Sequence, residues 1–92
     1  SRIPYLHIKS CDPEVRSRMQ QEGWPFARAV SEGVMCEPEL GLVDMKAFTE
    51  VLREVNFQGW AIVEQDMYPA PFDKPFPIAK RTREYLRRIG MG

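Results

Sequence analysis

The chain has 92 residues, of which 43% are hydrophobic and 28% are charged, a composition that excludes a disordered tail and a fibrous repeat. One small domain is the most that this length accommodates, and its core is thin because a chain of this size buries only ~60–65% of its unfolded surface. Thirteen Lys and Arg residues balance thirteen Asp and Glu residues, so the net charge predicts no nucleic acid partner and no membrane partner.

The apolar segments and the cysteines predict a cytoplasmic protein. No segment approaches the ~18 consecutive apolar residues of a membrane-spanning helix, and the first residues lack the pattern of a signal peptide. The two cysteines, Cys11 and Cys36, fit neither a zinc site nor a disulfide framework, so we expect reduced thiols. The chain begins at Ser1 and enters a predicted strand two residues later, from which we expect that other residues precede it.

The first predicted elements are a strand and a helix. The strand covers residues 3–9, with Pro4 near its start, where a strand tolerates proline. Asp12 and Pro13 predict a helix start, because the carboxylate caps free N–H groups and proline fits the first helical position. Gly23 is the predicted end of this helix.

Two further helices and a loop are expected next. Pro25 opens a short helical segment, and residues 34–43 lack a clean period, which predicts a loop whose charged residues Glu37 and Glu39 face water. Asp44 then caps a longer helix. Apolar residues recur along this helix at helical spacing and form a stripe that must pack against another element. The members of the stripe are Met45, Phe48, Val51, Leu52 and Val55.

A second strand and a last helix complete the predicted order βαβα. Residues 60–63 form a compact apolar run that turns polar at Glu64, as a buried strand does where it leaves a sheet. The four prolines of residues 69–77 indicate a stiff loop, and the helix that follows ends at Gly90. Five basic residues near its end are opposed only by Glu84 and are interpreted as a solvated face that suits the helix dipole.

The long helical connection between the two strands predicts that they are parallel, since a hairpin needs a short link. Two parallel strands leave both edges of the sheet open. The sequence therefore predicts either a piece of a larger α/β fold or assembly with copies of itself.

Ionisable side chains follow both predicted strands. Alternation places His7 and Lys9 on one face of the first strand, and Glu64 and Asp66 on one face of the second. These are the C-terminal ends of the strands, where folds built from βα units carry their active sites. If the strands are neighbours, about 4.8 Å apart, His7 and Glu64 can bind one divalent ion such as Mn, Co, Zn or Mg. Lys9 can supply a cation to a substrate oxygen, and further metal ligands must come from outside the chain.

Structural interpretations of the same residues remain open. A histidine at a strand end is often a hydrogen-bonded structural residue, and Glu64 can simply stand at the solvent boundary. Lys9 and Asp66 can form an ion pair with each other. Four aromatic residues can stack on a sugar but are more typical of a core. The four are Tyr5, Trp24, Trp60 and Tyr68.

The segments YLHIKSCDPEV and GWAIVEQDMYP resemble the end of the sugar phosphate isomerase/epimerase family, which consists of xylose isomerase-like TIM barrels. The inosose dehydratases are closest in pattern, with a His-Leu-Lys-Asp strand, a following Asp-Pro and a late Val-Glu-Gln-Asp strand. The resemblance implies an α/β fold in which residues 1–92 are the C-terminal part of one TIM-barrel domain. This part corresponds to strands 7 and 8 with their helices, out of a barrel of ~250 residues.

The resemblance also implies roles for three residues. His7 and Glu64 match divalent-metal ligands of the family, and Lys9 matches a substrate contact. The remaining metal carboxylates and the acid/base partner belong to earlier strands. Ser10 stands where the inosose dehydratases usually have Asp, and residues 38–44 replace a loop that commonly carries two glycines close together. Both departures bear on the substrate and leave the metal pair intact.

The leading hypothesis is the C-terminal segment of a divalent-metal-dependent isomerase, epimerase or dehydratase for a sugar or cyclic polyol. These reactions share removal of a proton next to a carbonyl, with the enediolate stabilised by the metal, and the 92 residues alone are predicted to be inactive. An alternative is a non-catalytic barrel fragment that folds with the rest of the barrel or as a homo-oligomer. An apurinic-endonuclease-like repair enzyme is the weakest hypothesis, because the balanced net charge opposes DNA binding.

Overall fold

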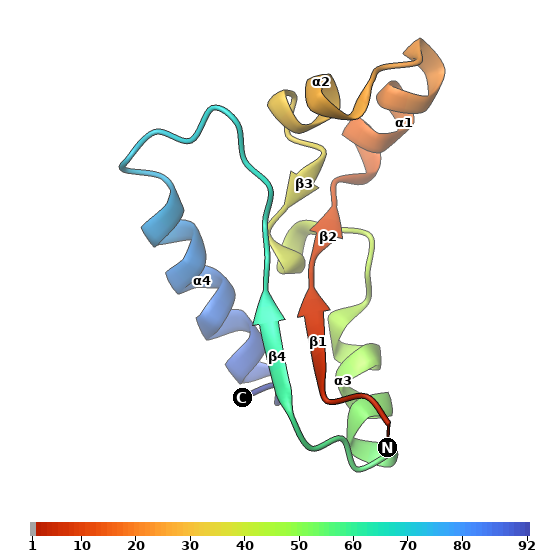
Figure 1. The fold of residues 1–92 in the computed structure, drawn as a ribbon, viewed down its shortest axis with the longest axis vertical. Coiled ribbons are helices and arrows are strands. Elements are labelled where there is room, and N and C mark those ends of the chain that lie inside the picture. The colour runs from red at the N-terminus through yellow and green to blue at the C-terminus, as the bar shows by residue number, and fades with distance from the viewer. Residues whose placement is uncertain (1) are drawn as a thin grey trace.

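The computed structural model describes residues 2–92, which form a small α/β unit around a two-stranded parallel sheet (Figure 1). In chain order the elements are β1 (Tyr5–Ile8), β2 (Ser10–Cys11), α1 (Pro13–Glu22), α2 (Phe26–Ser31), β3 (Met35–Cys36), the 3-10 helix η1 (Pro38–Leu40), α3 (Met45–Glu54), β4 (Trp60–Val63) and α4 (Pro75–Arg88). The predicted α/β class and the predicted order of the main strands and helices are confirmed.

The parallel pairing of β1 with β4 is also confirmed, and it aligns the ends of the two strands. Ile8 lies opposite Val63, and the Glu64 N–H donates a 3.0 Å hydrogen bond to the Ile8 carbonyl. Glycine is required where the chain enters β4, because a Cβ at Gly59 would overlap the carbonyl oxygen of Pro4. The C-terminal ends of both strands therefore meet at one edge of the sheet.

The main core lies between one face of β1 and the helices α3 and α4. Its buried members are Ile8, Met45 and Leu86, each at most 4% exposed. The apolar stripe of α3 packs there through Met45 and Phe48. Val51 stays half exposed, because a sheet of two strands is too narrow to cover the whole stripe.

The prediction that residues 60–63 form a buried strand is wrong for this chain. All four residues of β4 are exposed, Trp60 by 79% and Ile62 by 48%. Among the described residues β4 pairs only with β1, so its second edge is open. The apolar face that β4 shares with Tyr5 is open as well.

Between β1 and α3 the chain extends beyond the C-terminal end of the sheet (Figure 1). β2 and β3 pair antiparallel at its base, and α1 and α2 are packed around a separate core of Trp24, Ala29 and Val34. The guanidinium carbons of Arg18 and Arg28 lie 5.1 and 4.7 Å from the centroid of the Trp24 ring. Cation–π attraction thus adds to burial in fixing this ring.

Residues 34–43 contain β3 and η1 instead of the predicted loop, and their glutamates do not simply face water. The Nη2 atom of Arg81 lies 2.6 Å from Glu37 Oε1, and that of Arg88 lies 3.2 Å from Glu39 Oε1. These ion pairs join α4 to the segment that precedes α3. All five basic residues of α4 are nevertheless exposed, which confirms the interpretation of a solvated face, and two of the five also form these ion pairs.

The predicted helix starts are confirmed by hydrogen bonds. Asp12 Oδ1 accepts the N–H groups of Glu14 and Val15 at the start of α1, and Asp44 Oδ1 accepts that of Ala47 in α3. Each carboxylate satisfies N–H groups that have no partner within the helix.

The helix boundaries differ from the prediction at α4. Gly23 ends α1 as expected, with a left-handed φ of 65°. The predicted proline loop extends to residue 77, whereas α4 already begins at Pro75. Pro75 and Pro77 both lie in the first turn, where the missing N–H has no partner to lose. No helix within residues 2–92 has the length and apolar character needed to cross a membrane.

Candidate metal and substrate site

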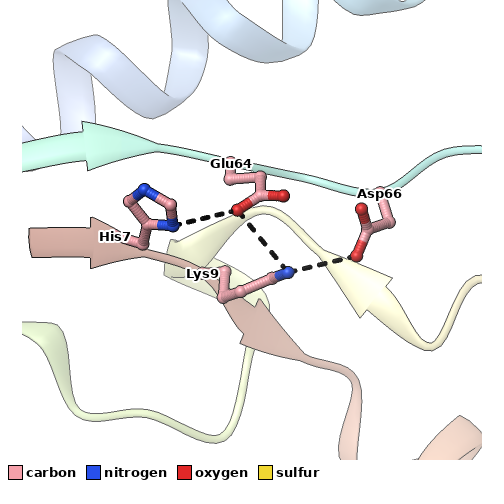
Figure 2. Close-up of polar contacts among 4 residues, drawn as sticks. All are labelled: His7, Lys9, Glu64 and Asp66. Carbon is pink, nitrogen blue, oxygen red and sulfur yellow. Dashed lines mark hydrogen bonds and ion pairs between the residues drawn. The ribbon is translucent and has the colours of Figure 1, made fainter.

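The four ionisable residues predicted at the strand ends lie together on the open face of the sheet (Figure 2). His7 belongs to β1 and Lys9 follows it directly, while Glu64 and Asp66 follow β4. Alternation along each strand turns these four side chains to one face, and Leu6 and Ile8 on the other face pack on the core. The cluster is half-buried, with side-chain exposures between 34% and 55%.

Three polar contacts connect the cluster (Figure 2). His7 Nδ1 lies 3.3 Å from Glu64 Oε2, and Lys9 Nζ lies 3.8 Å from the same oxygen. Lys9 Nζ also donates a 3.1 Å hydrogen bond to Asp66 Oδ2. The predicted Lys9–Asp66 ion pair is therefore confirmed, and Glu64 Oε2 faces both a ring nitrogen and an ammonium.

The donor atoms of His7 and Glu64 have a spacing that fits one divalent ion. Two ligand atoms that each lie about 2.1 Å from one ion are ~3.0–3.4 Å apart at octahedral or tetrahedral angles, and the observed separation is 3.3 Å. Imidazole nitrogen and carboxylate oxygen together suit Mn, Co and Zn, and Mg accepts the carboxylate. Within residues 2–92 no group of three or more His, Cys, Asp or Glu is arranged to hold a metal ion.

Of the four aromatic residues considered for sugar stacking, one lies in a core and three are exposed. Trp24 is 8% exposed, as the core interpretation predicts, whereas Tyr5, Trp60 and Tyr68 are each more than half exposed. The ring centroids of Tyr5 and His7 are 5.8 Å apart, so Tyr5 lies beside the cluster. The core interpretation is wrong for the three exposed rings, and sugar stacking stays a prediction for them.

Ser10 and residues 38–44, which are the two departures from the inosose dehydratase pattern, contact each other. The sequence did not predict this contact. Ser10 is 4% exposed, and its Oγ accepts the N–H of Val43 at 3.1 Å. A Cβ at Gly41 would overlap the Ser10 side chain. The buried Ser10 and a glycine at position 41 therefore fit as a pair.

Comparison with known proteins finds curated relatives for nearly the whole of this chain. No family model matches the chain, and no solved structure matches it. Curated relatives that match it are named inosose dehydratase: the protein of Geobacillus thermodenitrificans is 34% identical over 87 residues, or 95% of this chain and 29% of the relative. Those of Clostridium beijerinckii and Klebsiella pneumoniae are 31% and 30% identical over 95% and 94% of this chain and 29% and 28% of their own lengths.

The resemblance to inosose dehydratases is thus confirmed along nearly the whole chain. The chain spans about 29% of the length of the curated relatives it matches.

Proposed function

We propose that this chain is the C-terminal part of a divalent-metal-dependent enzyme that dehydrates or isomerises a cyclic polyol or sugar. The observation that carries the proposal is the 3.3 Å approach of His7 Nδ1 to Glu64 Oε2 on the open face at the C-terminal edge of a parallel sheet. Similarity to proteins named inosose dehydratase favours dehydration of a ketone derived from inositol.

The same proposal makes β1 and β4 the seventh and eighth strands of a TIM barrel, with α3 and α4 as their helices. Three features of the sheet support it. The strands are parallel, one face of β1 packs on both helices, and the other face exposes Tyr5, Trp60 and Ile62. In a barrel this second face points to the interior, where side chains from the other strands cover it.

His7 and Glu64 would hold the ion, which is Mn, Co, Mg or Zn, and two further ligands would come from residues outside this chain. When bound, the ion would supply Lewis-acid stabilisation of negative charge on a substrate oxygen. His7 uses Nδ1 toward Glu64, which leaves its second ring nitrogen for a hydrogen bond that orients the ring.

Lys9 is the residue of this chain that we propose to contact the substrate. Its ammonium lies between two carboxylates, and its side chain remains 37% exposed, so the ammonium can donate a hydrogen bond to a hydroxyl or carbonyl oxygen. A positive donor stabilises that oxygen as negative charge develops on it. The base that removes the proton next to the carbonyl would come from another part of the enzyme, so the 92 residues alone are inactive.

Substitution of these residues in the complete protein tests the proposal. We expect His7→Ala and Glu64→Ala to lose the bound metal and to lower inosose dehydration by at least about 100-fold, the scale for losing a stabiliser of developing charge. Lys9→Met is expected to retain the metal and lower kcat/KM. Glu50→Ala, an exposed change on α3, is the control. Full metal content and turnover in both ligand variants would contradict the proposal.

A second candidate is a fragment without catalytic function that folds by association. The exposure of all four residues of β4 favours it, because apolar strands with open edges are templates for pairing.

A further inference from the structure

The ammonium of Lys9 has two carboxylate neighbours at unequal distances. It lies 3.1 Å from Asp66 Oδ2, within hydrogen-bond distance, and 3.8 Å from Glu64 Oε2. The second oxygen is the same atom that faces His7 Nδ1 at 3.3 Å. Lys9 and any cation held by His7 and Glu64 therefore compete for one oxygen atom (Figure 2).

Competition of this kind weakens metal binding unless the ammonium has another partner. An ammonium hydrogen-bonded to Glu64 would neutralise the charge that attracts a divalent ion, and the two cations would repel each other at short range. Asp66 stands two residues beyond Glu64 on the same face and has a side-chain exposure of 34%. It offers Lys9 a charge-assisted hydrogen bond away from the metal ligands.

We propose that Asp66 is a positioning residue, which holds the Lys9 ammonium off Glu64 and so keeps Glu64 Oε2 and His7 Nδ1 available to a divalent ion. The inference rests on the proposed function, because it takes Glu64 to be a metal ligand. It assigns a role to a residue for which the resemblance to inosose dehydratases supplied none. It also explains why two carboxylates accompany a single lysine at this edge of the sheet.

A double-mutant cycle tests the role of Lys9 in this effect. The Kd for Mn²⁺ is measured for this chain by NMR line broadening at His7 and Glu64, in the wild type, Asp66→Asn, Lys9→Met and the double variant. We expect Asp66→Asn to raise the Kd about twofold to fivefold when Lys9 is present, the scale of a half-exposed ion pair. A smaller rise is expected in the Lys9→Met background, since no ammonium is left to move. An equal or larger rise there would overturn the proposal, because Asp66 would then act by its own charge.

A measurement without metal separates this inference from the metal site itself. The NMR signal of the Lys9 ε-methylene group should shift in Asp66→Asn and stay unchanged in Asp73→Asn, which removes an exposed carboxylate outside the cluster. An unchanged Lys9 signal in Asp66→Asn would overturn the positioning role. Absence of broadening at His7 and Glu64 in the wild type would instead contradict the proposed metal pair and, with it, the positioning role, even where a shifted Lys9 signal shows that Asp66 holds the ammonium.

Discussion

At the scale of single residues, Cys36 is the side chain whose chemistry the fold alters most. Burial, and to a lesser extent the nearby Asp12, Cys11 and Glu37, together raise the pKa of its thiol from about 9 to about 11. Because the thiolate is the reactive form, Cys36 is protected from alkylation at neutral and mildly alkaline pH.

Alkylation of Cys36 by iodoacetamide tests this protection in a Cys11→Ser variant. At pH 9 we expect the folded chain to react at least about tenfold more slowly than the same chain in urea, because the thiolate is the attacking species. Equal rates in the two states would contradict the raised pKa.

The raised pKa also links stability to pH. Above pH 9 the unfolded chain loses the thiol proton, whereas the folded chain keeps it up to about pH 11. The unfolded state therefore binds fewer protons in this window, and the free energy of unfolding falls as the pH rises through it.

The residues of the candidate site could be predicted from the sequence, but only some of their contacts could be. The two-residue period of strands and the parallel pairing bring His7 and Glu64 together, and both facts follow from short sequence patterns. The packing of Ser10 against Gly41 was not predictable. Positions so far apart in the chain leave no local pattern, since only the folded backbone brings them together.

At the scale of elements, α3 depends on its cap and on its apolar stripe. Asp44 Oδ1 accepts the N–H of Ala47 at 2.9 Å, which satisfies one of the free donors of the first turn. The stripe is anchored by Met45, which is 2% exposed. The helix thus starts where the capping residue Asp44 is followed directly by the buried Met45.

Removal of this cap has a measurable consequence. We expect Asp44→Ala to lower the free energy of unfolding by about 1 kcal/mol, the usual loss when an N-cap carboxylate is replaced by Ala. Urea denaturation followed by circular dichroism gives the value. Glu50→Ala on the exposed side of α3 is the control and should change stability by less than about 0.5 kcal/mol. Equal effects of the two substitutions would show that the cap contributes nothing.

The elements that the sequence missed are those without a repeat. β3 has two residues and η1 has three, too few to show a period of 2 or 3.6. The ion pairs of Glu37 and Glu39 with α4 join segments that are distant in sequence. By contrast, the caps Asp12 and Asp44 were predictable, because a cap acts on the two or three residues that follow it.

At the scale of the whole molecule, the sheet is incomplete on one face and at its edges. β4 pairs only with β1 among the described residues, and a groove of about 500 Å³ lined by Val63, Ile78 and Ala79 separates β4 from α4. The apolar composition of β4 predicted a buried strand, because such runs are typical of strands that other elements cover on both faces. A sheet of two strands does not cover β4 in this way. We therefore expect further strands, or a second copy of the chain, to cover this exposed surface.

Sedimentation velocity of this chain tests that requirement. We expect the wild type to associate and Trp60→Glu to shift the population toward monomer, because a carboxylate on the open face of β4 opposes apolar contact. Phe26→Glu, which changes an equally apolar ring that is 62% exposed on α2, should leave association unchanged. A monomeric wild type that unfolds cooperatively would contradict the requirement for association.

The central claim is that His7 and Glu64 together form half of a divalent-metal site. A titration of this chain with Mn²⁺, followed residue by residue in amide NMR spectra, tests it most directly. The account predicts selective broadening around His7 and Glu64, which lie 3.3 Å apart at their donor atoms, and loss of that broadening in His7→Ala and Glu64→Ala. A well-dispersed spectrum without local broadening at these residues would contradict the claim and leave the pair a structural contact.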